Sequence, residues 1–154
     1  TRESKRSREL VLDVGVSQLS GGSKTSVGGY AEGIEDAEES AQFDISDNRT
    51  LDEIVGWLLE LGYIPSFCTA CYRAGRTGDR FMELAKTGEI ATYCQANAVM
   101  TLKEYMEDYA SEATKTAGEA VIKAELPKIP HEKIRQASEK RLVRIEEGER
   151  DFRF

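Results

Sequence analysis

The 154-residue sequence contains little histidine, cysteine, proline or tryptophan: one histidine, three cysteines, three prolines and one tryptophan. With its single histidine, His131, set between Pro130 and Glu132, a Ser-His-Asp catalytic set is not credible. No stretch approaches the ~20 consecutive apolar residues of a transmembrane helix, which excludes a membrane-spanning protein. Three cysteines cannot all pair within one chain, and a chain of this size needs no disulfides. A reducing, cytoplasmic location is therefore expected.

The chain also lacks an excess of positive charge, because its formal net charge is -7 and its basic residues alternate with acidic ones. Such a surface repels phosphate backbones, so no nucleic-acid partner is expected. A composition of 40% hydrophobic and 32% charged residues is typical of one globular domain. The start Thr1-Arg2-Glu3 has neither an initiator methionine nor an apolar secretory segment, and we expect a piece of a longer protein.

Hydrophobic periodicity predicts a mainly α protein with one short strand. The strand is expected over Gly15–Ser20, where valines precede a pair of glycines, and Gly21–Asn48 is interpreted as a connector. The predicted helices cover residues 2–12, Leu51 to the glycine stop at Gly62, residues 79–86, Leu102 to Pro127, and a charged segment after Pro130. Two of them are expected to open at capping boxes, Thr50–Glu53 and Thr101–Glu104. Because one strand cannot form a sheet, the first helix and strand are interpreted as an α/β unit separated from its neighbours.

The strongest chemical signal is Cys68-Thr-Ala-Cys71, followed after residues 72–93 by Cys94. A two-residue spacer lets both thiolates of the first pair point to one metal or cluster. Pro65 is placed to stiffen the approach to this motif. Three basic side chains nearby would favour thiolates and cluster sulfides, namely Arg73, Arg76 and Arg80.

Counting ligands separates the possible occupants of this motif. A structural zinc site needs four protein ligands, and His131 lies in a separate helical segment without the spacing of known zinc modules. His131 is interpreted as a surface residue at a helix start. A cubane cluster held by Cys68, Cys71 and Cys94 would keep one iron without a protein ligand, which favours reactivity over electron transfer. Spacing alone leaves iron-sulfur, zinc and incidental or redox thiols all open.

Two other motifs have simpler interpretations. The sequence Gly21-Gly-Ser-Lys-Thr25 suggests a phosphate-binding loop, but its glycines do not match the G-x-x-x-x-G-K spacing, and a plain turn is favoured. The tyrosines that flank the cysteines are interpreted as packing residues, with no catalytic role assigned to Tyr63, Tyr72 or Tyr93.

Three long segments resemble the C-terminal region of the radical SAM tyrosine lyases that mature iron-only hydrogenase, the HydG type. They are Gly15–Thr25, Gly62–Gly78, which contains the CxxC pair, and Leu102–Ala110. The resemblance covers nearly the whole chain. It implies a terminal piece of the radical SAM barrel with a connector over residues 1–45, and a helical auxiliary cluster domain over residues 46–154.

The resemblance further implies that Cys68, Cys71 and Cys94 hold an auxiliary 4Fe-4S cluster, whose open iron carries an additional iron bound by a cysteine amino acid. In such enzymes a radical made from S-adenosylmethionine on a second 4Fe-4S cluster splits tyrosine into p-cresol and a fragment. That fragment becomes carbon monoxide and cyanide on the extra iron, giving an iron carbonyl-cyanide unit for the H-cluster of the hydrogenase. The implied partners are the cysteine-bound iron, the tyrosine-derived fragment and the hydrogenase maturation machinery.

The sequence departs from this family in one respect, because the CxxxCxxC motif of the radical-generating cluster is absent. The chain alone is therefore expected not to start the radical reaction. As residues of a barrel end, Arg2, Gln18, Ser20 and Ser23 are candidates to face the substrate in the intact enzyme. The alternatives are a zinc-stabilised helical interaction module that uses the three cysteines and His131, and a chain with three free thiols and no metal.

Overall fold

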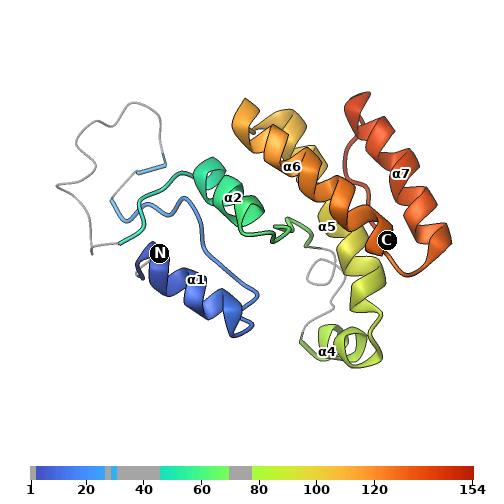
Figure 1. The fold of residues 1–154 in the computed structure, drawn as a ribbon, viewed down its shortest axis with the longest axis horizontal. Coiled ribbons are helices and arrows are strands. Elements are labelled where there is room, and N and C mark those ends of the chain that lie inside the picture. Colours follow the sequence, from blue (N-terminus) through green and yellow to red (C-terminus); the bar gives the residue numbers. More distant parts are fainter. Residues whose placement is uncertain (1–2, 27–28, 31–45, 70–77) are drawn as a thin grey trace. The chain divides into compact units, whose positions relative to one another are not determined.

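The computed structural model describes residues 3–26, 29–30, 46–69 and 78–154, with the side chains of 78–81 left out. The described helices, drawn in Figure 1, are α1 Lys5–Asp13, α2 Leu51–Glu60, α4 Gly78–Thr87, α5 Ile90–Asp108, α6 Glu112–Glu125, the 3-10 turn η1 Leu126–Lys128 and α7 Glu132–Glu146. The chain divides into two compact units, unit 1 (Thr1–Ile54) and unit 2 (Val55–Phe154). The expected mainly α fold is confirmed.

Helix α1 of unit 1 has a well-defined start and end. The hydroxyl of Ser4 accepts a hydrogen bond from the Ser7 N–H (3.3 Å), which satisfies one amide of the first turn. Gly15 ends the helix with φ +96°, a conformation that residues with a Cβ rarely adopt. There the Val16 N–H bonds back to the Val11 carbonyl (3.0 Å). The helix predicted over residues 2–12 is confirmed as an element, with its bounds at Lys5–Asp13.

The strand predicted over Gly15–Ser20 is wrong, since none of these residues is in a strand. A strand exists only through hydrogen bonds to a neighbouring strand. Val14 and Val16 are also 81% and 43% exposed, so they lack the packing of a barrel strand. The β-branched residues favour extended backbone, but no strand in the described part of the chain pairs with them.

Helix α2 begins at the first predicted capping box. The Thr50 N–H donates to the Glu53 carboxylate (2.7 Å), and the Glu53 N–H donates to the Thr50 hydroxyl (3.2 Å). Gly62, at φ +81°, supplies the left-handed residue after the helix, and the Tyr63 N–H bonds to the Leu58 carbonyl (2.9 Å). Both predicted ends of this helix are confirmed.

The second predicted capping box is wrong. Thr101 lies in the middle of α5, which begins eleven residues earlier at Ile90, after Gly88 (φ +77°) has ended α4. The predicted continuation to Pro127 is also broken, because α5 ends at Asp108 and Ser111 caps a new helix, α6. The apolar stripe continues across this break, so periodicity alone reads two helices as one.

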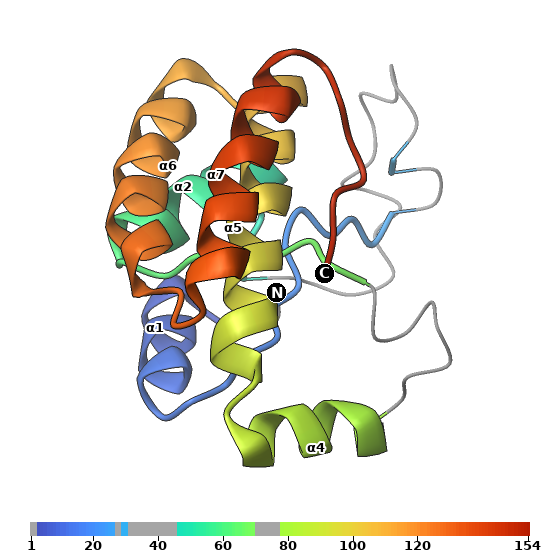
Figure 2. The ribbon, with the colours of Figure 1, turned by 90° about the vertical axis from the view of Figure 1, so that its right-hand side faces the viewer.

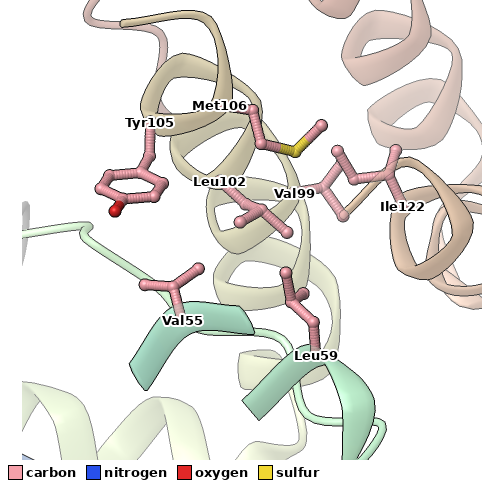
Figure 3. Close-up of a cluster of buried hydrophobic side chains, with 7 residues drawn as sticks. All are labelled: Val55, Leu59, Val99, Leu102, Tyr105, Met106 and Ile122. Atoms are coloured by element: carbon pink, nitrogen blue, oxygen red, sulfur yellow. The ribbon is translucent and has the colours of Figure 1, made fainter. Parts of the chain in front are cut away.

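Unit 2 is a layer of α-helices in which α5 packs against both α6 and α7, as Figure 2 shows. Its apolar cluster combines side chains from α2, α5 and α6: Val55, Leu59, Val99, Leu102, Tyr105, Met106 and Ile122 (Figure 3). Gly118 of α6 is buried, and a Cβ at this position would meet the side chain of Met106 of α5, which would have to move. In the parts of the chain that the structure describes, no helix has the length and apolar character needed to cross a bilayer.

Candidate metal centre

Cys94 lies in the second turn of α5 in unit 2, and its side chain is half-buried. The next residue, Gln95, donates its side-chain amide to the carbonyl (3.1 Å) and the carboxylate (3.0 Å) of Glu125. These bonds tie the first turns of α5 to the end of α6. Cys94 is thus carried on a fixed helix rather than on a loop.

Cys68 follows the loop that leaves α2, and it too is half-buried. Its N–H donates to the Ser66 hydroxyl (3.3 Å). The preceding N–H, that of Phe67, donates to the Thr101 hydroxyl oxygen (3.2 Å), and the Phe67 ring stacks on the Tyr105 ring with centroids 5.0 Å apart. The loop is therefore attached to α5 directly before the first cysteine.

The attachment points and Cys94 share one face of α5. Thr101 and Tyr105 follow Cys94 by seven and eleven residues. Since an α-helix turns about 100° per residue, these three positions lie within about 20° of one direction on each side. The face of α5 that bears Cys94 is therefore also the face that holds the Cys68 loop.

Asn97, one turn after Cys94, is buried and connects this face to the C-terminal segment. Its side-chain oxygen accepts a hydrogen bond from the Phe154 N–H (2.9 Å). Its backbone carbonyl accepts one from the Thr101 hydroxyl (2.9 Å). The side chain and the backbone carbonyl of Asn97 thus connect α5 to the C-terminal segment and to Thr101.

The C-terminal segment after α7 returns along α5, as Figure 2 shows. Arg150 makes two bonds to Asp108 (2.9 and 2.5 Å), and this pairing lowers the pKa of that carboxyl. The Phe152 N–H donates to Glu104 (3.3 Å), whose pKa is raised chiefly by burial. Arg141 covers the ring of Phe154, 4.0 Å from its centroid. Together with the bond from Phe154 to Asn97, the segment contacts α5 at three levels, the last of them one turn after Cys94.

Of the three predicted ligands, the structure describes Cys68 and Cys94, whereas Cys71 lies outside the described residues. Within the described ranges, no three His, Cys, Asp or Glu side chains come together to form a metal site. The meeting of all three thiols therefore stays a prediction. Arg73 and Arg76 also lie outside, and the side chain of Arg80 in α4 is not described.

The donor set itself fits an iron-sulfur cluster. Thiolates are the ligands of such clusters, and both described cysteines lie in unit 2 with side chains only partly covered, so incoming iron and sulfide can reach them. The polar contacts that hold the loop and the helix in place are made by the N–H groups of Phe67 and Cys68 and by the side-chain amide of Gln95. Three soft ligands would hold a cluster and leave one of its metal positions without a protein sulfur.

The remaining sequence candidates have clear positions. His131 is exposed and stands at the N-cap of α7, as predicted for a helix-start surface residue. Tyr63 and Tyr93 are 36% and 38% exposed, so the interpretation of these two as packing residues is only partly met. Tyr72 lies outside the described residues.

The candidate substrate-facing residues belong to unit 1. Arg2 lies outside the described residues, Gln18 and Ser20 are exposed, and Ser23 is half-buried. The Ser20 carbonyl accepts a hydrogen bond from the buried guanidinium of Arg8, which fixes the backbone at this point. Their role toward a substrate stays a prediction.

Sequence reasoning missed the residues that hold this site together. Thr101 was assigned to a helix cap, and Asn97 was given no role, because both act through contacts with segments far away in the sequence. The seven-residue spacing between Cys94 and Thr101 is a signal that could have placed them on one face.

Comparison with known proteins gives two findings. The family model described as Biotin and Thiamin Synthesis associated domain matches residues 1–64. A crystal structure described as HydG, a maturase of the [FeFe]-hydrogenase, matches all of this chain at 51% identity with a TM-score of 0.89. The chain spans 33% of the length of that protein. Among curated proteins no match is found. The predicted resemblance to HydG-type maturases is therefore confirmed, and the chain corresponds over its whole length to about one-third of such a protein.

Proposed function

We propose that this chain is the auxiliary iron-sulfur region of a radical SAM tyrosine lyase that makes carbon monoxide and cyanide on iron for hydrogenase H-cluster assembly. The observation that carries the proposal is the CxxC…C thiol set within a chain 51% identical to HydG. The identity extends over the entire chain, which is stronger support than a short motif. The protein is proposed to act in the cytoplasm together with the hydrogenase maturation machinery.

The proposed role of the three cysteines follows from ligand chemistry. Cys68, Cys71 and Cys94 would bind as thiolates, each losing its proton. When bound, a four-iron cluster supplies an open metal position at which an additional iron, held by a cysteine amino acid as substrate, can be assembled with its diatomic ligands. The chain contributes the fixed helix of Cys94 and the fastened loop of Cys68, which set two of the thiols in advance.

A second proposed role concerns unit 1. Gln18, Ser20 and Ser23, with Arg2, are proposed to face the tyrosine-derived substrate in the longer protein. The bond from Arg8 to the Ser20 carbonyl supports this, because it holds the chain in one conformation at that point. S-adenosylmethionine and the radical-generating cluster would be bound by the part of the longer protein that this chain does not contain.

Anaerobic reconstitution with iron and sulfide tests the proposal. The chain should bind about four irons and give the electron paramagnetic resonance signal of a reduced cluster. Cys94→Ala should abolish iron binding, whereas His131→Ala should leave it unchanged, because His131 is an exposed N-cap residue. A colourless protein that takes up one zinc, and loses it in the His131→Ala variant, would instead support the zinc-stabilised module.

A further inference from the structure

We propose that Thr101 and Tyr105 are positioning residues that hold the Cys68 loop on the face of α5 that bears Cys94. The inference rests on the proposed function only for the identity of the ligand. The positioning itself is argued from contacts of the described residues in unit 2.

Thr101 uses its hydroxyl on two sides at once. Its proton is directed to the carbonyls of Asn97 (2.9 Å) and Ala98 (3.3 Å) within the helix. Its oxygen lone pairs then accept the Phe67 N–H (3.2 Å) from the loop. A hydroxyl bonded back to its own helix has a fixed rotamer, so it offers the loop an acceptor in one defined place.

Tyr105 supplies a flat surface next to this acceptor. It belongs to the apolar cluster and is 8% exposed, so its ring is held by the core. Phe67 stacks on this ring with an interplanar angle of 16°, and the Phe67 residue is 39% exposed. Stacking of this kind adds to the energy of burial and restricts the direction of the loop.

The two contacts complete an attachment that begins at the other end of the loop. Val55 and Leu59 of α2 pack in the same cluster as Tyr105, and Ile64 packs against that cluster. The loop between α2 and Cys68 is thus fixed where it starts and where it delivers the cysteine. Thr101 lies about 10 Å along the helix from Cys94, so it determines the loop's position without occupying the ligand position.

If Thr101 had only a structural role, its replacement would not change how the thiols of Cys68 and Cys94 are positioned. The matched control is Thr116 in α6, whose hydroxyl makes the same kind of bond to the Glu112 carbonyl (2.9 Å) on an exposed face. Thr101→Val and Thr116→Val each remove one hydroxyl at nearly constant shape. Thr101→Ser retains the acceptor and serves as the rescue variant.

The first measurement uses the full chain without metal, in a Cys71→Ser background in which Cys68 and Cys94 are the remaining thiols. A bifunctional maleimide that spans about 10 Å, the distance along α5 between Thr101 and Cys94, joins the two thiols, and the joined product is counted by mass spectrometry. Thr101→Val should lower the yield of the Cys68–Cys94 product about fivefold, the factor that corresponds to one net hydrogen bond. Phe67→Leu, which removes the exposed ring of the stack, should lower it similarly.

The rescue and control variants decide between positioning and general stability. Thr101→Ser and Thr116→Val should both stay within about twofold of the parent yield. Circular dichroism of every variant reports whether the helices remain. If Thr101→Val and Phe67→Leu both match Thr116→Val, or if Thr101→Ser joins as poorly as Thr101→Val, the inference is overturned.

A second measurement separates this inference from the proposed function. With Cys71 restored, the reconstituted Thr101→Val chain should lose iron to a chelator several-fold faster than Thr116→Val. Equal rates of loss would overturn the inference while leaving the cluster assignment intact. A parent chain that takes up no iron, yet joins its thiols in a Thr101-dependent way, would overturn the proposed function and support the inference.

Discussion

Each unit contains a buried cation, and the two cations differ in how exposed their carboxylate partners are. In unit 1 the side chain of Arg8 is 3% exposed, and its guanidinium pairs with the carboxylate of Asp47, whose side chain is 2% exposed. In unit 2 the ammonium of Lys103 has a side chain 6% exposed, but its three carboxylate partners are 33–55% exposed. One cation thus faces a buried partner, and the other faces partners that reach water.

The unit 1 pair is part of a small polar network. Asp47 also accepts two bonds from the Arg49 guanidinium (2.8 and 2.6 Å), and Arg8 reaches the Ser20 carbonyl. The bonds from Arg49 hold the pKa of Asp47 well below its usual range, against the effect of burial and with a further contribution from Arg8. The network joins α1 to the segments around Ser20 and Asp47, so it connects the described segments of unit 1.

Unit 2 instead depends on apolar packing, and Lys103 adds a connection at its edge. Its ammonium bonds to Glu107 of α5 (3.0 Å), Glu119 of α6 (2.5 Å) and Glu146 of α7 (2.8 Å). Burial would lower the pKa of Lys103, but the bonds to Glu119, Glu146 and Glu107 outweigh it, and the pKa is raised. The comparison teaches that loss of an ionic partner should be severe in unit 1 and mild in unit 2.

The largest effect is expected when Asp47 is removed. Asp47→Ala leaves the Arg8 charge buried and without its carboxylate, and breaking a buried pair costs about 3–5 kcal/mol. Hydrogen exchange of the α1 amides, followed by mass spectrometry, measures this loss within unit 1. The double variant Arg8→Met with Asp47→Leu should recover much of the protection, because it removes both charges.

A small effect of Asp47→Ala on hydrogen exchange would contradict this comparison. If Asp47→Ala changed the exchange of α1 by less than the equivalent of about 1 kcal/mol, the ion pair would contribute no more than an exposed one. Amides of α7 provide the internal reference, since α7 belongs to unit 2.

Acid should affect unit 1 through the same carboxylate, with an intermediate effect. The pKa of Asp47 is lower in the folded chain than in the unfolded one, so its stabilisation is complete above the unfolded value of about 3.9. It is lost progressively as the pH falls below that value towards the folded pKa. Amide NMR signals of α1, recorded from pH 6 to pH 2, should therefore lose dispersion in the acid part of the range.

A neutral variant isolates Asp47 from the other carboxylates in this titration. In Asp47→Asn the side chain keeps its shape and has no acid to protonate, so the unit should begin less stable and show a weaker acid step. Glu53, whose pKa is lowered by its bonds to Thr50, titrates in both proteins, so the difference between the two acid curves reports Asp47 together with its charge interaction with Glu53. Identical acid curves for the two proteins would remove Asp47 from the explanation.

The helices that sequence predicted well are those whose signals are local. Thr50 and Glu53 form their capping box, and Gly62 ends the helix, because each of these interactions joins residues three to five apart. The start of α5 was missed because Glu89 at its N-cap makes no side-chain capping bond. The break before Ser111 was missed because the apolar stripe continues through it.

The candidate site shows the same limit in another form. The cysteines were found because spacing in sequence reflects chelation, whereas Thr101 was read as a helix start. Its hydroxyl instead bonds to the Phe67 amide, 34 residues away in the chain. The buried Asn97 meets a segment 57 residues away. Contacts of this kind depend on how helices pack, and no local pattern encodes them.

The smallest effect is expected for Lys103. Lys103→Met keeps most of the buried aliphatic stem, and the three carboxylates it releases can be solvated, so the loss should be about 1–2 kcal/mol. Urea unfolding followed by the fluorescence of Trp57, the one tryptophan and a buried residue of unit 2, measures it. Lys115→Met, which removes an exposed pair with Glu112 (3.1 Å), is the matched control and should change stability by less than about 0.5 kcal/mol. A loss as large as that of Asp47→Ala would show that partner exposure does not set the cost.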